Sequence, residues 1–529
     1  ASAATSCTSR RAPPKFTPQR TVPWAADRTA QMLSAASTES RPRATFRAHL
    51  RRRFVRRLRR VVVITTATTT TMTMTTMTTR TSTGRPPFPA AMVQPGNLAD
   101  RWAQLRAHLF APVDATSLAI FRIAFGLIML WEVWRYFSYG WITRYYVDPI
   151  LFFSYIPGVT PWPGDGMYWH FGLMGVLAVL IAVGLWYRVA AVLFWLSFTY
   201  VFLLDKANYL NHFYLVSLMS LLLAVVPAQR GLSLERLFGR SNTPAQVPRW
   251  SLWLLRSQIV IVYFYGGIAK LNGDWLQGAP LDSWLAVRSS LPLIGPLLAQ
   301  PWSGVVFAYG GLLIDLSVGW LLLWGRTFLL GVLVALMFNL LNAYIFSIGI
   351  FPYFMLAACV LFAPPHWFRR QAYAAPIHTP QRRDTLLLAA IACYLLVQLV
   401  VPLRHWAYPG DVAWTEEGHR FSWRMKLRDK EANAVFSVVD PRTGEVRPLY
   451  PEDWLTLRQA SKMPARPDMV LQFAHAVADV YEEEYGVRPR IYGDVWASLN
   501  GRPPQPLIDP MADLAAQPPS LWPAHWIMR

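Results

Sequence analysis

Charged residues are scarce in this sequence. They make up 15% of its 529 residues, against roughly 25% in an average soluble domain. Hydrophobic residues account for 53% of the chain, and the mean hydropathy is positive. Such a composition excludes an ordinary soluble globular protein, and it predicts a polytopic membrane protein.

Acidic residues are almost absent from residues 1–91, which contain 17 Lys and Arg but only Asp27 and Glu39. This leader therefore carries +15 of the formal net charge of +21. The rest of the chain has 34 basic and 28 acidic residues, a net charge of about +6. A basic balance can indicate nucleic-acid binding. Here it is confined to the leader, and we expect no nucleic-acid partner.

The leader combines an arginine cluster (RRRFVRRLRR, 51–60) with a threonine and methionine repeat (65–83). Sequence of such low complexity cannot form a packed core. It can be interpreted as a targeting peptide, as a nucleic-acid-binding arm, or as upstream sequence translated from a misplaced start. We favour the third interpretation, because targeting signals do not ordinarily contain such a repeat. The protein would then begin near Met92, and we assign residues 1–91 no function.

Cysteine is also scarce. Cys7 lies in the leader, and Cys359 and Cys393 lie in apolar runs. The C-terminal segment has no cysteine, which excludes a disulfide there. We expect Cys359 and Cys393 to be buried and to act as small hydrophobic residues. We expect no metal cofactor.

Long hydrophobic runs recur from Thr116 onward, and nine of them are long enough to span or nearly span a bilayer. The predicted spans are 116–138, 167–187, 189–204, 210–227, 251–270, 303–324, 327–346, 348–363 and 384–402. Arginine is concentrated in the even-numbered connections, for example Arg188, Arg230 and Arg326. Basic connections stay on the cytoplasmic side. The pattern therefore predicts a cytoplasmic N-terminus and an exterior C-terminus, which is periplasmic in a bacterial inner membrane or lumenal in a eukaryote.

Residues 403–529 have a different hydrophobic pattern from the predicted spans. Short alternating stretches (AVFSVVD, EVRPLY), a DPRTGE turn and a helical pattern (DMVLQFAHAVADVYEEEYG) predict a compact exterior α+β domain. The predicted fold class is thus a mainly α polytopic membrane protein, with a transmembrane domain at 92–402 and an exterior domain at 403–529. Two long aromatic connections, 139–166 and 271–302, are expected to be re-entrant or interfacial pieces on the side of the exterior domain.

Several ionisable or polar residues lie within or at the ends of the predicted spans. Because such residues are costly in a membrane, each is a functional candidate. The alternative is that they pair with one another and hold helices together, which we prefer for Arg122, Arg256 and Asp315. The full set is Arg122, Glu132, Arg256, Gln258, Lys270 and Asp315.

Lys206 follows the third predicted span, in VFLLDKANYLNHFY (201–214). It could be an interfacial lysine whose ammonium reaches the water. However, the predicted topology places it on the outer face, where a positive charge is not required. A lysine in a largely apolar pocket gives up its proton more easily, because desolvation disfavours the ammonium. The hypothesis is that Lys206 is a catalytic base.

Six segments, in order along the chain, resemble the vitamin K-dependent gamma-glutamyl carboxylases. The resemblance covers nearly everything after the leader. It is to family members of the horizontally transferred transmembrane domain type, and it is consistent with a bacterial homologue. The segments are VFLLDKANYLNHFYL (201–215), RSQIVIVYFYGGIAKLNGDWLQG (256–278), GGLLIDLSVGWLLL (310–323), FSIGIFPYFMLAA (346–358), RFSWRMKL (420–427) and RIYGDVWASLNGRPPQPLIDP (490–510).

The resemblance implies a membrane enzyme of the carbon–carbon lyase class. It would oxygenate reduced vitamin K (the hydroquinone) to the epoxide with O2, and add CO2 to the γ carbon of a glutamate in a protein or peptide. A γ C–H group is too weak an acid for a side-chain base near neutral pH, so the basicity must come from quinol oxidation. The quinol is lipid-soluble, and aromatic walls near the bilayer surface would suit it.

Site residues follow from the same resemblance. The family's base matches Lys206, its nearby Asn-His pair matches Asn211 and His212, and a histidine at the start of the exterior domain matches His405. We therefore predict catalytic roles for Lys206, His212 and His405. The predicted substrate-binding residues are Asn211 and the family's glutamate-binding segment, Phe421, Ser422, Trp423, Arg424 and Met425.

The chain departs from the family in three places. It has GHRFSWRM where the family has a GLYGYSWDM pattern, with His419 and Arg424 as substitutions. The cysteine pair of the animal enzymes is absent, and the chain stops near SLWPAHW. One alternative is therefore a quinol epoxidase that does not carboxylate peptides. Another is a non-enzymatic transporter, although no inverted repeat is visible. The oligomeric state and the quinone used are not predicted.

Overall fold

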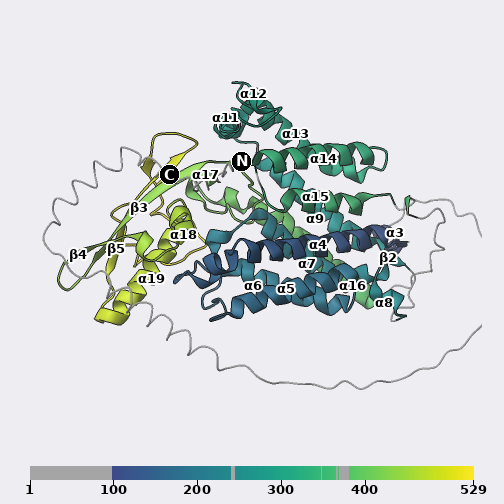
Figure 1. Cartoon of the computed structure of the whole chain (residues 1–529), viewed down its shortest axis with the longest axis horizontal. Coiled ribbons are helices and arrows are strands. Elements are labelled where there is room, and N and C mark those ends of the chain that lie inside the picture. The colour runs from purple at the N-terminus through teal and green to yellow at the C-terminus, as the bar shows by residue number, and fades with distance from the viewer. Residues whose placement is uncertain (1–97, 240–244, 347, 365–366, 369–380) are drawn as a thin grey trace, which may run out of the picture. The chain divides into compact units, whose positions relative to one another are not determined.

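The computed structural model describes residues 98–239, 245–346, 348–364, 367–368 and 381–529 (Figure 1). These residues belong to one compact unit of the chain. The predicted leader, and the arginines at 240, 369 and 370, lie outside the described residues.

Every predicted span is helical in the described part of the chain. Seven helices are long and apolar enough to cross a membrane. They are α4 (Thr116–Ser138), α5 (Gly166–Val183), α6 (Tyr187–Leu204), α9 (Arg249–Ala269), α13 (Ser303–Leu323), α14 (Phe328–Phe346) and α16 (Arg382–Val400). Two are shorter: α7 (Asn211–Val225), and α15 (Phe351–Cys359) with its extension η4 (Val360–Phe362). The mainly α polytopic membrane fold is confirmed.

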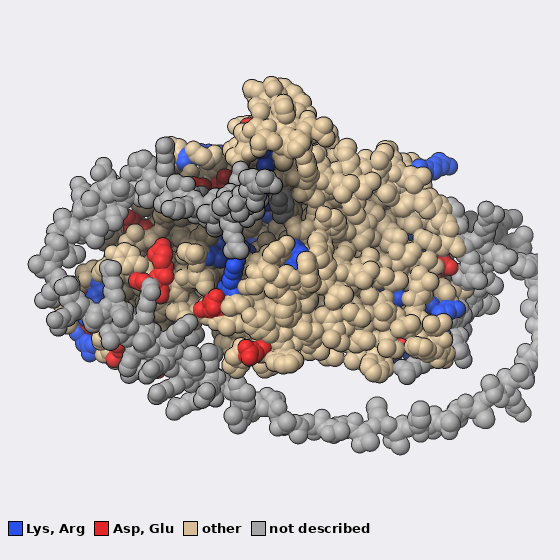
Figure 2. Space-filling view, viewed as in Figure 1, with Lys and Arg blue, Asp and Glu red and all other residues tan. Residues whose placement is uncertain are grey.

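The outer surface of the spans is apolar. Only 28% of the apolar window of α14 and 17% of that of α16 is buried within the protein, and the outward side chains are large hydrophobics such as Leu333 and Leu386. Figure 2 shows the visible face over the spans almost free of charged residues. Such a surface suits lipid and not water. Cys359 is buried as predicted, but Cys393 is exposed on α16, so its predicted burial is wrong. Its side chain points away from the neighbouring helices.

Small residues let some of the spans pack closely, which is common between membrane helices. Gly126 of α4 lies directly against α5: a Cβ added to it would be 2.6 Å from the Ala178 carbonyl oxygen and 2.7 Å from the Ala182 Cβ. The core of the spans combines aliphatic side chains with aromatic rings, and Phe125 contacts Phe194 edge-on at 5.8 Å.

Three ionisable residues of the spans find partners in two ways. The ammonium of Lys270, at the end of α9, forms an ion pair with Asp315 of α13, so the predicted pairing is correct for Asp315. Arg122 and Arg256 instead donate to backbone carbonyl oxygens, Arg122 to Ile181 (3.1 Å) and Arg256 to Leu361 (2.7 Å). These two arginines hold helix ends together without a carboxylate.

The second and fourth connections contact each other, and the fourth also contacts the segment before the first span. Strand β1 (Pro112–Asp114) pairs with β2 (Gln246–Pro248), and the helix α3 (Leu98–Phe110) precedes β1. Glu235, in the short helix α8 (Leu234–Leu237), accepts a hydrogen bond from the Tyr187 backbone at the start of α6. Two of the basic connections, the second and the fourth, thus lie together.

The long odd-numbered connections contact the C-terminal domain, as predicted. In the first, which contains the one-turn helix η1 (Thr143–Val147), the Leu151 carbonyl accepts a hydrogen bond from Gln459 (2.8 Å). In the second, Asp274 accepts one from Asn500 (2.7 Å). The short helices of the second connection are α10 (Gly273–Leu276), α11 (Leu281–Ala286) and α12 (Gly295–Leu298).

The C-terminal domain is α+β, as predicted. Its antiparallel sheet has the order β4-β3-β5-β6, and α19 (Pro467–Tyr485) packs on it through Phe473 and Phe436. The strands are β3 (Lys430–Val439), β4 (Val446–Leu449), β5 (Arg490–Leu499) and β6 (Gln505–Pro506); the short helices are η6 (Val401–Ala407), α17 (Val412–Thr415), η7 (Pro451–Asp453) and α18 (Leu457–Lys462). Strand β5 was used above only as a family motif, although its alternating burial is that of a half-buried strand.

Candidate functional site

A cavity of about 750 Å³ lies between the ends of the spans and the C-terminal domain. Its apolar lining comes from α4, α9, α13, α14 and α15 and from the aromatic connections. Its polar lining comes from the start of α7, from residues 419–428 and the region around α18 in the C-terminal domain, and from polar side chains of the spans such as Glu132 and Asp315. Apolar walls with a few convergent polar groups are typical of a small-molecule site.

Four of the predicted site residues line this cavity: Asn211, His212, Arg424 and Met425. Asn211 joins the two motifs directly, because its side-chain amide donates to the Arg424 carbonyl oxygen (3.1 Å) and its amide oxygen accepts from the Tyr209 hydroxyl (2.9 Å). The His212 ring packs edge-on against Phe213 at 4.8 Å. Motifs more than 200 residues apart in the sequence therefore meet at one wall.

Lys206 lies in the one-turn helix η2 (Lys206–Asn208), outside the cavity wall. Its ammonium forms an ion pair with Asp468 (3.2 Å) and donates to the Gln472 side-chain oxygen (3.1 Å), both on α19. The expectation of a largely apolar pocket is therefore wrong, since a helix of the C-terminal domain supplies polar partners. One aromatic wall remains, the Tyr155 ring, 5.8 Å from the ammonium nitrogen.

Phe421 and Trp423 form an aromatic cluster beside the cavity. Phe421 contacts Tyr209 (5.5 Å) and Tyr214 (4.9 Å), and Trp423 stacks on Tyr214 (4.8 Å). Phe421, Trp423 and Lys426 all have positive φ, at 64°, 55° and 51°. Bulky residues rarely adopt this backbone conformation, and such strain is concentrated at ligand-binding and catalytic sites.

Ser422 and His405 each donate a hydrogen bond to a backbone carbonyl oxygen nearby in the sequence. The buried Ser422 hydroxyl donates to the Gly418 carbonyl (2.6 Å). His405, on η6, donates through Nδ1 to the Pro402 carbonyl (2.8 Å), which leaves Nε2 as the nitrogen with a free lone pair. Neither residue lines the cavity.

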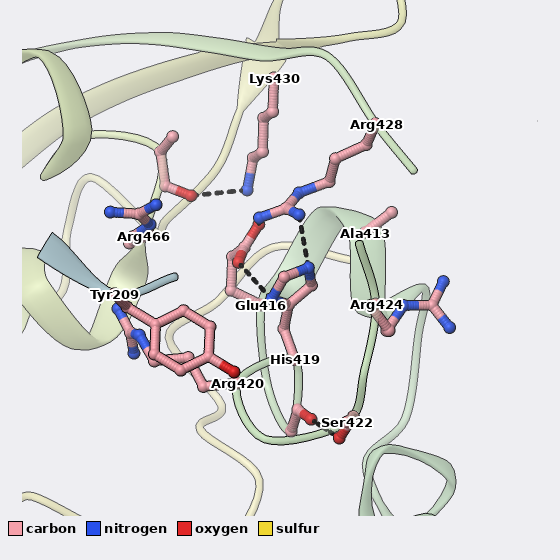
Figure 3. Close-up of polar contacts among 12 residues, drawn as sticks. Tyr209, Ala413, Glu416, His419, Arg420, Ser422, Arg424, Arg428, Lys430 and Arg466 are labelled. Carbon is pink, nitrogen blue, oxygen red and sulfur yellow. Dashed lines mark hydrogen bonds and ion pairs between the residues drawn. The ribbon is translucent and has the colours of Figure 1, made fainter. Parts of the chain in front are cut away.

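Glu416, His419 and Arg428 form a buried polar network (Figure 3). Arg428 forms an ion pair with Glu416 and donates to His419 Nε2. Burial, together with the charges of Arg428 and Arg424, holds the pKa of His419 well below its usual value. His419 is therefore neutral near pH 7, and it serves as an acceptor.

The electrostatics around Lys206 depend on two carboxylates. Burial alone would raise the pKa of Asp468, but Arg420 (2.7 Å) and Lys206 outweigh it and keep that pKa below its usual value. Burial raises the pKa of the neighbouring Asp205 to about 6, although the Ala207 N–H and Gln459 both donate to it. Asp468 is thus the charged partner of Lys206.

Sequence reasoning left several cavity residues out of the site. The ion pairs Lys270–Asp315 and Glu132–Arg135 (2.7 Å) both line the cavity. Glu132, Lys270 and Asp315 are polar residues of the predicted spans, and this feature of the sequence could have identified them as site residues. Arg458 also lines the wall; nothing in its local sequence connects it to the cavity.

Cofactor requirements can be compared with the donor groups present. Among the described residues, no group of three or more His, Cys, Asp or Glu side chains is placed to hold a metal ion. The apolar and aromatic lining of the cavity suits a quinone-sized ring system with a lipid tail, and the Asn211 and His212 side chains offer it polar contacts.

Comparison with known families agrees with this architecture. The profile of the HTTM domain matches residues 110–367, and that of the vitamin K-dependent gamma-carboxylase lumenal domain matches residues 383–529. No solved structure matches the chain. The two profiles cover the spans and the C-terminal domain in the order in which they occur, and the cavity lies where those parts meet. The chain belongs to the vitamin K-dependent gamma-glutamyl carboxylase family.

Proposed function

We propose that this protein carboxylates the γ carbon of glutamate in a protein or peptide, using reduced vitamin K, O2 and CO2, and that it forms the quinol epoxide in the same cycle. The observation that carries the proposal is the cavity wall at which Asn211 and His212 of one family motif meet Arg424 and Met425 of another. Family membership supports the same chemistry.

The apolar part of the cavity is the proposed quinol site, with Asn211 and His212 as its polar contacts. When bound, the quinol supplies through its oxygenation the basicity that no side chain has near neutral pH. Lys206 is the proposed acceptor of the first quinol proton; Asp468 and Gln472 hold it outside the cavity wall, so this role requires the quinol hydroxyl to reach beyond the cavity to the lysine.

The glutamate is proposed to bind at the 421–425 loop. Arg424 is the group suited to its carboxylate, because a guanidinium can bind a carboxylate in bidentate fashion. Phe421 and Trp423 fix the loop through the aromatic cluster, and the Ser422 hydroxyl ties it to Gly418. The lone pair on Nε2 of His405 makes it a supporting proton acceptor.

We place the active site on the outer side of a bacterial inner membrane, with the N-terminus in the cytoplasm. The support is the contact between the basic second and fourth connections, while the two long odd-numbered connections contact the C-terminal domain.

The test uses the full chain in detergent with reduced vitamin K, O2, labelled bicarbonate and a short glutamate peptide. Epoxide and fixed label are measured together. We expect both products from the wild type and neither from Lys206→Ala. Lys462→Ala, which removes an exposed lysine from α18, is the matched control and should keep both products. Epoxide formation by a folded Lys206→Ala variant would exclude Lys206 as the base.

A second candidate is a quinol epoxidase that does not carboxylate peptides. The observation in its favour is Arg424, a positive charge where the family pattern has an acidic residue. Epoxide without fixed label, across peptides of differing sequence, would favour this function.

A further inference from the structure

Lys430, the first residue of β3, has polar partners but no carboxylate in an ion pair. Its side chain is partly buried, and its amine nitrogen donates to two backbone carbonyl oxygens, those of Trp414 and of Ala465 (2.9 Å for Ala465). The Trp414 ring lies 5.3 Å from the same nitrogen. In the described part of the chain this amine forms no ion pair. It differs in this from Lys206 and Lys270, which each contact an aspartate.

Two arginines beside Lys430 also lack acceptors. Arg428 is paired with Glu416, but its buried Nε has no hydrogen-bond partner among the described residues. Arg466 follows Ala465 in the chain, and its Nη1 contacts the Met469 sulfur (3.9 Å). Lys430, Arg428 and Arg466 all interact with the charge of Glu416 (Figure 3). One carboxylate cannot balance three partly or fully buried cations.

Part of the Lys430 population is a neutral amine near pH 7. Burial lowers the pKa of Lys430 to about 8, and the charges of Arg428 and Arg466 act in the same direction. Glu416 and Asp411 act in the opposite direction without offsetting them. About one amine in ten is then neutral at pH 7, against fewer than about one in a thousand for a lysine in water. A neutral amine has two N–H groups for the two carbonyl oxygens, and its lone pair can act as a nucleophile.

A neutral amine reacts reversibly with CO2. The nitrogen lone pair forms a bond to the carbon of CO2, one C=O electron pair moves onto oxygen, and one N–H proton passes to water. Nothing is oxidised or reduced. The product is a carbamate, so the side chain changes from a cation to an anion. Its two oxygens have the planar arrangement of a carboxylate, which a guanidinium can bind in bidentate fashion.

We propose that Lys430 is a site of modification by CO2, and that its carbamate is the counter-charge which Arg428 and Arg466 lack. The modification removes one unpaired cation and supplies an acceptor in the same step. Both arginines line the cavity and Lys430 does not, so the carbamate binds them from behind the wall and leaves the cavity free for ligands. The proposal goes beyond the proposed function, because it requires CO2 but neither quinol nor glutamate.

The carbamate can be trapped before it reverts. The full chain in detergent, without quinol or peptide, is equilibrated with isotope-labelled CO2 and treated with triethyloxonium ion, which alkylates carbamates. Digestion and mass spectrometry then locate the tag. We expect occupancy at Lys430 to exceed that at the paired Lys206 and the exposed Lys462 by about ten-fold. At constant CO2, occupancy should rise from about pH 7 to about pH 8.5, because only the neutral amine reacts.

Two further measurements test the role of the arginines. Arg466→Gln removes a charge that lowers the pKa of Lys430 and that would bind the carbamate, so occupancy should fall several-fold. Arg490→Gln, an exposed arginine on the sheet, should leave occupancy unchanged. CO2 at constant pH should raise the melting temperature of the wild type. It should not raise that of Lys430→Arg, which keeps a cation and N–H donors but cannot form a carbamate.

Absence of the tag from Lys430 at saturating CO2, or equal occupancy at Lys462, would overturn the proposal. So would unchanged occupancy in a folded Arg466→Gln protein, because the arginine would then not be the partner of the carbamate. Turnover is a separate result. A tagged Lys430 in a protein that yields neither epoxide nor fixed label would uphold the modification while refuting the carboxylase function. Both products from a protein without the tag would do the reverse.

Discussion

At the scale of single residues, the C-terminal domain determines the surroundings of the groups that matter. Lys206 follows an apolar span, yet its ammonium contacts Asp468 and Gln472 because α19 packs over η2. Local sequence predicts the position of this lysine at the end of a span. It cannot predict the carboxylate, because Asp468 lies more than 260 residues further along the chain.

The lowered pKa of His419 predicts how the folding stability changes in acid. Its pKa is held well below about 6.5, the value of an unfolded histidine. Below about pH 6.5 the unfolded chain therefore binds a proton that the folded chain does not, and folding stability falls by up to about 1.4 kcal/mol per pH unit. Above that pH this histidine contributes no pH dependence. We expect His419→Gln to unfold less steeply with acid than the wild type, as measured by unfolding midpoints between pH 7 and pH 5.

The difference between variants isolates this histidine from other titrating groups. Asp205 acts in the opposite direction, since its folded pKa of about 6 lies above the unfolded value of about 3.9; its destabilising effect declines as the pH falls through 6. Met511→Ala, at an exposed position without a titratable group, should keep the wild-type acid slope. Equal slopes for His419→Gln and the wild type would show that His419 titrates normally.

At the scale of elements, hydropathy predicts where the helices are but not how closely they approach. The spans were predicted from apolar runs and arginine spacing, and all nine are helices. The close contact of α4 with α5 depends on the absence of a side chain at Gly126, a feature that becomes visible only once the two helices are paired.

Gly126→Ala should destabilise the fold. The added methyl group would lie 2.6 Å from a backbone oxygen and 2.7 Å from Ala182, so the helices must separate, at a cost of about 1–3 kcal/mol. Gly172→Ala, on the partner helix α5, meets nothing within 4 Å and should change stability by less than about 1 kcal/mol. Thermal unfolding followed by tryptophan fluorescence compares the two. A Gly126→Ala variant as stable as Gly172→Ala would contradict the close packing.

At the scale of the whole molecule, the division into spans and an α+β domain could be predicted from apolar runs and local strand and helix patterns. The cavity could not. Arg458 and Arg466 reach its wall only because the C-terminal domain packs over the ends of the spans, and no hydropathy or charge period connects them with Arg135. Resemblance to the family located the two motifs that meet there, because both occur as ordered sequence segments.

The proposed topology predicts which cysteines a membrane-impermeant maleimide can reach. Met511→Cys replaces an 80% exposed residue of the C-terminal domain, and Arg326→Cys replaces an exposed residue between α13 and α14. With the native cysteines replaced by alanine, Met511→Cys should react in intact spheroplasts. Arg326→Cys should react only after permeabilisation. The reverse pattern would invert the topology, and the cysteine-free parent reports background labelling.

The Asp468 carboxylate has a consequence for how Lys206, the proposed base, can be studied. One of its oxygens contacts both Lys206 and Arg420, so truncating the lysine leaves the acid with a guanidinium at 2.7 Å. No isolated charge is created between the domain and the spans. Arg420 thus remains as the counter-ion of Asp468. We expect that the Lys206 side chain can be removed without separating the C-terminal domain from the spans. Loss of activity in Lys206→Ala would then reflect the loss of the proposed proton acceptor and not the unfolding of the protein.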